Sequence, residues 1–353
     1  MPKKQTKQVK PVEALTRSEL IKQIGKERNS AVITYITGDR PNFSTNIGDD
    51  VIPILFRHLE LIGEKDNIDL FLYTRGGDMV VPVRIVKLIR NYCKKFGLIV
   101  AYRAHSAGTL IALGADEIVM SKLGELTPVD PTTGHPFNPR DPVDQRKVIP
   151  ISVEDITSYL LLAKDKGNVK GDRMVEIYDN LTKHSYPDPK HLHPLALGNV
   201  YRAQRMIRIL AQRLLGLHKD TEGSDKKAVE KIVSEITSDI CVHNYPIYRD
   251  EAKSLGLNVI MPKNELEKLV WALYEKYAQD MELTKQFSPL ELLGQNNSLN
   301  IKYGAAYIES EKAQDTFYYD IRMNKVMAAQ APGQPPLPAV NVNVAGFAWE
   351  KVK

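Results

Sequence analysis

Two short turns contain the groups best suited to acyl-transfer chemistry. One turn reads RGGD over residues 75–78, and the other reads HSAG over residues 105–108. A serine hydroxyl at the beginning of a helix can act as a nucleophile, and the helix dipole favours negative charge that develops there. Paired glycines let the backbone approach a ligand closely, so that their amides can stabilise an oxyanion. These residue types make Ser106 a candidate nucleophile beside the amides of Gly76 and Gly77.

Each turn also has a simpler interpretation when it is taken alone. A serine at a helix start is commonly an N-cap, and two glycines after a strand are commonly only a turn. The combination of the two turns on successive strand–helix units favours a catalytic site. The residues by themselves leave both interpretations open.

Predicted strands and helices place the two turns at one edge of a sheet. Runs of apolar and β-branched residues predict strands at 31–36, 68–73, 98–102 and 117–120. Capping residues and amphipathic spacing predict helices at 50–62, 80–92 and 106–115, and a further helix that ends near residue 29 and is capped by Thr16 or Ser18. This alternation indicates an α/β fold with a parallel sheet. Ligands of such sheets bind outside the carboxyl ends of the strands, where both turns lie.

The rest of the sequence adds a long loop, several helices and two polar ends. Residues 124–150 are rich in proline and glycine, and a loop of this length is typically functional or disordered. Further helices are predicted at 153–166, 171–182, 195–217, 226–237 and 266–281. The composition from about residue 330 is typical of a flexible tail.

Composition argues against several classes of protein. The 353 residues are 43% apolar and 26% charged, as expected for a globular protein with a substantial core. No apolar run is long enough to span a bilayer, and no apolar segment of a secretory signal follows the N-terminal lysines. The net charge of +5 is too mild to indicate nucleic-acid binding. Cys93 and Cys241 suggest no disulfide framework, so we expect a reduced, cytoplasmic setting.

Two groups of polar side chains in the second half do not indicate a site. Three histidines lie close together in the sequence: His184, His191 and His193. No HExxH or paired CxxC motif accompanies them, so a solvated loop explains them better than a metal site. Four arginines form a basic run: Arg202, Arg205, Arg208 and Arg213. They fit a helix face better than a nucleic-acid surface. We therefore expect neither a metal nor a cofactor.

The stretch from residue 68 to residue 134 resembles the core of the serine dehydrogenase proteinase family, which is related to Clp proteases and signal-peptide peptidases. The similarity rests on GGD after a strand, on HSAGTLIALGADEIVM and on LTPVDP. Near the far end, HNYPI at 243–247 and EAKSLGLNV at 251–259 resemble the closing motif of the family. The resemblance runs intermittently from about residue 31 to residue 261 and is loose over 165–235. It implies a ClpP/crotonase-like core of repeated ββα units.

The resemblance also implies a peptidase mechanism. Ser106 takes the place of the nucleophile. Gly77 and Ala107 take the places of the residues whose amides form the oxyanion hole, and Gly76 matches the first glycine of the motif. Arg75 stands where these relatives usually have proline. The implied substrate is a peptide or protein, no cofactor is required, and relatives assemble into closed homo-oligomers.

The proton acceptor for the serine is the open part of this assignment. His105 is adjacent to the serine, but consecutive side chains at such a turn diverge. Clp-type relatives have a histidine in the region that follows, which reads LTPVD at 126–130 here, so a triad of that pattern is absent. Asp130 could orient a base rather than act as one.

A base from the long loop remains possible by analogy with a second group of relatives. Signal-peptide-peptidase relatives use a lysine that follows the serine at a greater distance, which makes Lys147 the first candidate. A lysine accepts a proton near neutral pH only when burial or a nearby cation lowers its pKa. The alternatives are His135 on the same loop and His243.

The expected organisation is a ClpP/crotonase-like domain with additions at both ends. We expect a disordered arm at 1–15 and the main domain at 16–262, with a helical insertion at about 165–237. A C-terminal helix with short strands is expected at 263–326, followed by a flexible tail at 327–353.

Two functions compete with peptide hydrolysis. Acyl-CoA hydratases and isomerases of the crotonase type use the same sheet and oxyanion amides, but they act through carboxylates, and the HSAG sequence argues against them. A degenerate peptidase that serves as a scaffold or adaptor is compatible with the missing histidine. The sequence does not identify the substrate or any unfoldase or membrane partner.

Overall fold

The computed structural model describes residues 10–130, 132–141, 143–167, 171–182, 193–220, 223–240, 242, 244–328 and 336–352. Most of the expected N-terminal arm lies outside these residues, although a short 3-10 turn, η1 (Val12–Ala14), is described. Four residues singled out in the sequence also lie outside them: His184, His191, Cys241 and His243.

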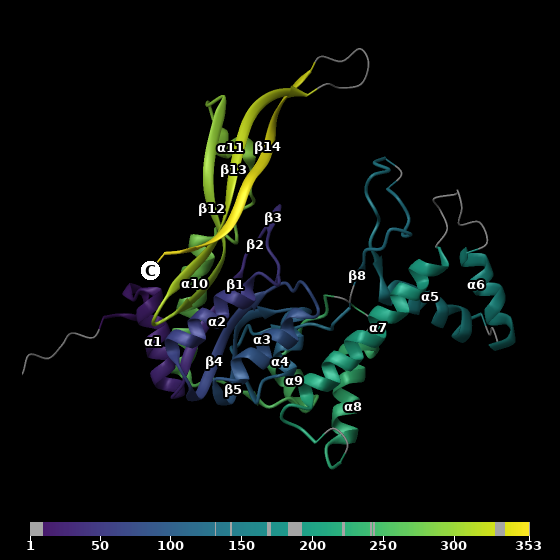
Figure 1. The fold of residues 1–353 in the computed structure, drawn as a ribbon, viewed down its shortest axis with the longest axis horizontal. Helices are drawn as coiled ribbons and strands as arrows, with labels where there is room; N and C mark the ends of the chain where they lie inside the picture. Colours follow the sequence, from purple (N-terminus) through teal and green to yellow (C-terminus); the bar gives the residue numbers. More distant parts are fainter. Residues whose placement is uncertain are drawn as a thin grey trace, which may run out of the picture.

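A ten-stranded mixed sheet runs through the protein (Figure 1). Its central strands are parallel and lie in the order β6, β5, β4, β1. Their bounds are Glu117–Met120 (β6), Cys93–Ala104 (β5), Lys65–Thr74 (β4) and Ala31–Thr37 (β1). The helices between successive strands are α2 (Val51–Ile62), α3 (Val81–Arg90) and α4 (Ala107–Leu113). This arrangement confirms the predicted α/β class.

Helices cover both faces of the sheet. Side chains along a strand alternate between its faces, so neighbouring residues of one strand belong to separate apolar clusters. Residues such as Ile33 and Leu70 pack with α2, α3 and α4. Residues such as Val32 and Phe71 pack with α1 (Arg17–Arg28) and α10 (Asn264–Asp280) on the other face. Of the two candidate caps of α1, Thr16 is the one used, and it forms a capping box with Glu19.

Short elements complete the core. A small hairpin joins β2 (Asp39–Arg40) to β3 (Phe43–Ser44). Strand β7 (Glu125–Leu126) pairs with β5 and with β10 (Ile247–Tyr248), and β11 (Val259–Ile260) pairs with β6. Helix α9 (Arg249–Ser254) connects β10 to β11. The segment that resembles the closing motif of the family therefore returns to the parallel sheet.

A helical extension stands away from the sheet (Figure 1). Helix α7 (Pro194–Leu215) connects this extension to the core. Its later residues, including Ile207 and Leu214, pack in the core beside α4. Beyond the core, the extension contains α5 (Val153–Asp165), η2 (Gly171–Arg173) and α6 (Met174–Thr182). Helices α8 (Lys226–Ser234) and η3 (Glu235–Asp239) pack on the core instead, where Val229 and Ile236 are buried. The long proline-rich loop contains β8 (Thr132–Thr133), which pairs with β9 (Ile151–Ser152). This β8–β9 hairpin projects beside the far end of α7 (Figure 1).

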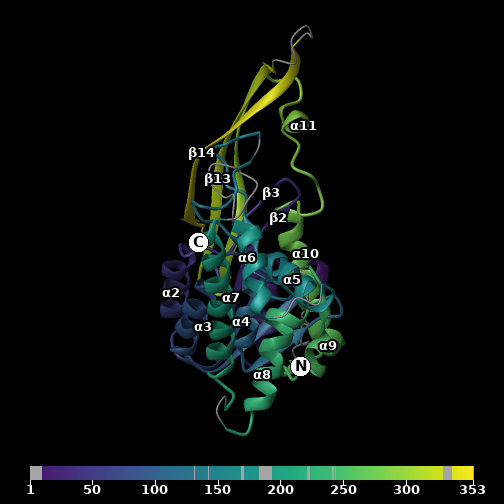
Figure 2. The same cartoon turned by 90° about the vertical axis from the view of Figure 1, so that its right-hand side faces the viewer.

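A second extension corrects the sequence-based picture of the C-terminus. Strands β12 (Ser298–Ser310), β13 (Gln314–Ala328) and β14 (Leu337–Lys351) form an antiparallel arm that projects beyond the core (Figures 1 and 2). The short helix α11 (Pro289–Leu293) packs on the arm. The expectation of short strands and then a flexible tail is wrong for these residues. Proline and glycine around residues 331–336 dominated the composition and concealed the alternating Val340, Val342 and Val344.

The described part of the chain offers no candidate membrane span and no candidate metal site. None of its helices has the length and apolar character needed to cross a bilayer. Within the same residues, no three histidine, cysteine or acidic side chains gather as a metal site would require.

We expect stability to fall as the pH drops below about 6.5, the ordinary value for histidine. Burial lowers the pKa of His58, although the hydrogen bond with Asp315 at 2.9 Å opposes this effect. Burial also lowers the pKa of His218, although its hydrogen bond with the carbonyl of Leu113 opposes this effect. At a pH below the ordinary pKa of histidine, the unfolded chain therefore binds protons at these two residues that the native chain does not bind. This difference favours unfolding as the pH falls. Urea midpoints measured from pH 7.5 to 5.5 should decline, and His218→Gln should flatten part of the decline. A decline unchanged in that variant would contradict the assignment to His218.

Candidate active site

The two turns singled out in the sequence lie side by side. Strands β4 and β5 are parallel neighbours, with Thr74 paired to Ala104 at their carboxyl ends. The amide of His105 donates to the carbonyl of Thr74 at 3.1 Å. A Cβ atom built on Gly76 would lie 3.0 Å from Cβ and 3.4 Å from Oγ of Ser106. The Ser106 hydroxyl is thus next to the glycine pair.

Ser106 has an unusual backbone conformation. Its φ of 50° and ψ of −107° lie outside the regions that side chains normally allow, immediately before the first residue of α4. Such a conformation costs about 1–3 kcal/mol and persists only where the surroundings enforce it. The Ser106 side chain makes no capping hydrogen bond to α4. The interpretation of this serine as an ordinary N-cap therefore does not apply.

Thr127 holds this conformation in place, and the sequence analysis did not identify it. Its Oγ1 accepts the Ser106 amide at 2.9 Å and donates to the carbonyl of Pro128 at 3.1 Å. Thr109 Oγ1 in turn accepts the Thr127 amide and donates to the Thr127 carbonyl. Thr127 belongs to the LTPVDP motif, which was noted only as part of the family resemblance.

Thr127→Val is expected to loosen the nucleophile turn. The variant has nearly the same shape but leaves the partly buried Ser106 amide without its acceptor, which costs up to about 3 kcal/mol. Urea unfolding should register that loss, and reaction of Ser106 with a serine-directed fluorophosphonate should slow. Thr127→Ser keeps the hydroxyl and is the matched control. Equal behaviour of the two variants would show that the hydrogen bond does not position Ser106.

The glycine pair is fixed by the segment that precedes α2. The Ile47 amide donates to the Gly76 carbonyl at 2.8 Å, and the Asp78 amide donates to the Ile47 carbonyl at 2.9 Å. The Gly76 amide is itself taken by Thr74 Oγ1 at 3.0 Å. Gly77 lies between these bonds, and among the described residues its own amide has no hydrogen-bond partner. Its φ of 148° favours glycine.

The free amides define one side of the candidate site. Ala107 is the first residue of α4, so its amide has no acceptor within the helix. The Gly77 amide is unpaired in the described residues, and the Gly76 amide is occupied. Of the three residues assigned to oxyanion binding, Gly77 and Ala107 therefore have available donors, whereas Gly76 contributes its conformation.

His105 is directed to a carboxylate. Its Nε2 lies 2.9 Å from Oε1 of Glu125, and Arg103 contacts the same carboxylate at 3.3 Å. Burial alone would raise the pKa of Glu125, but the hydrogen bond from His105 and the neighbouring Arg103 outweigh it and hold the pKa below its ordinary value. Arg103 also reaches Asp39 at 2.9 Å. His105 thus belongs to a hydrogen-bonded network with Glu125 and Arg103.

Among the described residues, the candidate bases Lys147 and His135 form no hydrogen bond with Ser106. Lys147 is exposed in a turn of the β8–β9 hairpin, where its backbone bonds to Asp141 and Asp144. His135, on the same hairpin, accepts the amide of Phe137. In the described residues, no side chain is hydrogen bonded to the Ser106 hydroxyl.

Asp130 and His243 complete the set of proposed residues. Asp130 accepts the Ser152 hydroxyl at 3.0 Å and the Glu154 amide at 3.3 Å, so it supports the start of α5. Neither of these contacts is with a candidate base. His243 lies outside the described residues.

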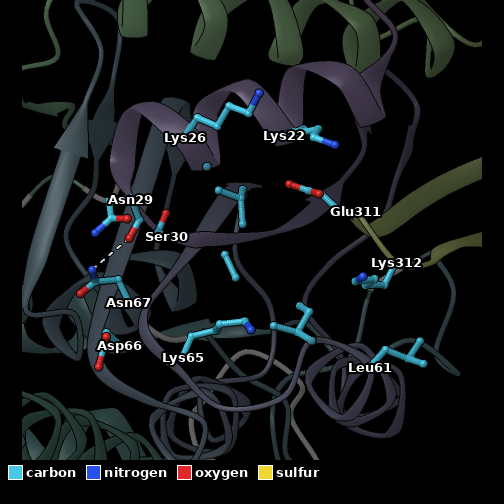
Figure 3. Close-up of a pocket in the computed structure, with 14 residues that line it drawn as sticks. Lys22, Lys26, Asn29, Ser30, Leu61, Lys65, Asp66, Asn67, Glu311 and Lys312 are labelled. Atoms are coloured by element: carbon cyan, nitrogen blue, oxygen red, sulfur yellow. Dashed lines mark hydrogen bonds between the residues drawn. The ribbon is translucent and has the colours of Figure 1, made fainter.

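A cavity of about 590 Å³ lies at the other end of the sheet (Figure 3). It is bordered by the first residues of β1 and β4, and four lysines line it: Lys22, Lys26, Lys65 and Lys312. The two turns lie at the carboxyl ends of the strands. This cavity is therefore separate from the candidate active site.

Comparisons with known proteins give one matching family and two similar relatives. A family described as "ClpP-like SDH-type serine proteinase" matches residues 2–196. Two uncharacterized proteins of Methanocaldococcus jannaschii are similar to the chain. One is 27% identical over 298 residues, covering 80% of this chain and 87% of the relative. The other is 26% identical over 278 residues, covering 76% and 78%.

Among solved structures, ClpP1 from Listeria monocytogenes matches with a TM-score of 0.34 and 14% sequence identity. The match covers 69% of this chain and 97% of that one.

Proposed function

Since this chain belongs to the family of ClpP-like SDH-type serine proteinases, we propose that it hydrolyses peptide bonds with Ser106 as the nucleophile. One observation carries the assignment. The Ser106 hydroxyl is not used as a helix cap, and the strained turn that presents it lies against the glycine pair. A serine that is held in a strained turn and does not cap the helix that follows it is typical of a nucleophile.

The proposed reaction follows serine acyl transfer. The Ser106 oxygen attacks the peptide carbonyl carbon and gives its proton to a base. The carbonyl oxygen becomes an oxyanion, which the amides of Gly77 and Ala107 stabilise by about 3 kcal/mol for each donor. The intermediate then breaks its C–N bond, and the amine leaves with the proton from the base. Water attacks the acyl-enzyme in the same way and regenerates Ser106.

Labelling with a fluorophosphonate tests the nucleophile directly. The probe should form one covalent adduct on the intact protein, and mass spectrometry of peptides should place it on Ser106. Ser254, which bonds only to the backbone of α9, offers a control as Ser254→Ala. Labelling that persists in Ser106→Ala would place the reactive group elsewhere.

The proton acceptor is proposed to come from the β8–β9 hairpin, with Lys147 first and His135 second. Lys147 is exposed in the single chain, and a lysine base needs burial. Packing of this hairpin against another copy would supply that burial, so the proposal is linked to a homo-oligomer.

Lys147→Met is expected to be as damaging as loss of Ser106, because the members of such a unit fail together. The wild-type rate should rise with pH through an apparent pKa below the ~10.4 of a free lysine. His135→Gln is the matched change on the same hairpin. Three results together would assign the role of the base to His135 instead: Lys147→Met keeps the full rate, His135→Gln loses it, and the wild-type rate follows an apparent pKa near 6.5.

The alternative function is a degenerate peptidase that acts as a scaffold. It is favoured by one observation, that no described side chain bonds to the Ser106 hydroxyl. Absence of fluorophosphonate labelling in a correctly assembled protein would support it. A crotonase-type acyl-CoA reaction would instead persist in Ser106→Ala.

A further inference from the structure

The last strand of the sheet has a long edge without a partner. β14 pairs with β13 over nearly its whole length, and no described strand pairs with its other edge. The strand lies in the arm that projects beyond the core (Figures 1 and 2). An unpaired edge presents a row of N–H and C=O groups that another strand can join.

Residues 339–344 form an open window within this edge. Pro338, which lacks an N–H group, bounds the window at one end. Ala345 bounds it at the other end. Val344 pairs with Ile321 and Gly346 pairs with Asp320, so Ala345 is the extra residue of a β-bulge. Natural edges are usually protected by charge, proline or bulges. The proline and the bulge protect the two ends of this window. The sequence between them, AVNVNV, contains no charged residue, although the whole chain has a net charge of +5.

An apolar face ends at this window. Val340, Val342 and Val344 share one side of β14, since side chains alternate along a strand. On β13, the partners of Val342 and Val344 are Met323 and Ile321, which are both buried. Val342 and Val344 themselves remain 37% and 42% exposed. Val342 and Val344 therefore lie at the solvent-exposed edge of an apolar face of the sheet.

The window is symmetric about Val342, because residues 340–344 read VNVNV in either direction. A twofold axis midway between two antiparallel copies of the strand, at the level of Val342, relates one copy to the other. It places Val340 opposite Val344 on one face and Asn341 opposite Asn343 on the other. Apolar side chains then meet apolar ones, amides meet amides, and no like charges oppose each other.

We propose that β14 is a self-association edge, at which two copies of this chain pair antiparallel about Val342 and continue the sheet from one copy into the other. A second copy fits better than an unrelated peptide because the strand is complementary to itself. Six residues from each strand bury less than the ~1,200 Å² of a standard interface. The contact is therefore weak and depends on protein concentration. It does not depend on peptidase activity.

A charge placed on the axis tests the contact. Val342→Lys sets each ammonium opposite its own copy, so the dissociation constant should rise at least tenfold in sedimentation of the full chain over a range of concentrations. Ser298→Lys adds the same charge to an exposed position of β12 and is the matched control. Identical sedimentation of Val342→Lys and wild type would overturn the proposal.

Cysteine pairs test the register independently of stability. In a chain carrying Cys93→Ala and Cys241→Ala, Val342→Cys should form a disulfide dimer under mild oxidation, because directly opposite residues lie about 5 Å apart. Val340→Cys should not link to itself, since the two copies of residue 340 are offset by four residues, or about 13 Å. A mixture of Val340→Cys and Val344→Cys chains should link. Equal linking of Val340→Cys and Val342→Cys, or no linking of any variant, would refute pairing about Val342.

Discussion

Ser106→Ala is expected to reduce peptidase activity by a factor on the order of 10⁴ or more, because loss of a nucleophile removes covalent catalysis altogether. The fold should be unaffected. The Ser106 hydroxyl makes no capping bond, and the backbone amide that Thr127 holds remains in alanine. Initial rates on an unstructured protein substrate and thermal unfolding of the same preparation measure the two effects.

The combination of lost rate and retained stability distinguishes a nucleophile from a structural residue. Thr127→Val is the useful comparison, because it should lower both quantities through the same turn. A Ser106→Ala protein that retains its rate would assign any activity to another group. One that unfolds at a clearly lower temperature would show that the serine has a structural role instead.

Gly77→Ala is expected to have the second-largest effect, on both stability and rate. A Cβ at this position would lie 2.3 Å from the carbonyl oxygen and 2.5 Å from the amide nitrogen of Ile47. Backbone atoms cannot move away as a flexible side chain would, so the loop must shift. We expect a loss of at least about 2 kcal/mol in unfolding free energy. Displacement of the Gly77 amide should also lower the rate by about 10²–10³-fold.

Gly63→Ala separates the steric effect from the backbone effect. Gly63 also has a positive φ, of 69°, but a Cβ built there meets no atom within 4 Å. With a ψ of 179°, Gly63 has a conformation that other residues rarely adopt, so the variant should cost about 1–3 kcal/mol from the backbone alone and leave the rate unchanged. If Gly77→Ala behaves like Gly63→Ala in urea unfolding and in turnover, close packing against Ile47 is not what positions the loop.

The parallel core could be predicted because its signals are local. Alternation of apolar runs with amphipathic segments located β1, β4, β5 and β6 and the helices between them to within a few residues. The two turns follow β4 and β5 directly, so predicting the strands also placed Ser106 near the glycine pair. The sequence narrowed the cap of α1 to Thr16 or Ser18, and the structure shows Thr16 in a capping box with Glu19.

The remaining features depend on partners far away in the sequence. Val340 and its neighbours become a strand only because β13 lies beside them, and a proline-rich composition nearby suggested a tail instead. Thr127 acts through a bond to an amide 21 residues earlier, which spacing alone does not reveal. Lys147 is a candidate base only through the resemblance to signal-peptide peptidases, and in the structure it lies in an exposed turn of the hairpin. Its role as the base stays a prediction.

The antiparallel pairing of β1 with β12 has a consequence for biosynthesis. Ile33 pairs with Ser310, and Arg17 of α1 forms a 2.8 Å ion pair with Glu309, which is buried. A ribosome releases α1 and β1 long before it reaches these partners. Until then β1 is an open edge of the nascent sheet, and contacts this distant in sequence form slowly. Completion of the α/β core is therefore a late step, and the interval before it is when the chain is most exposed to aggregation and most dependent on chaperones.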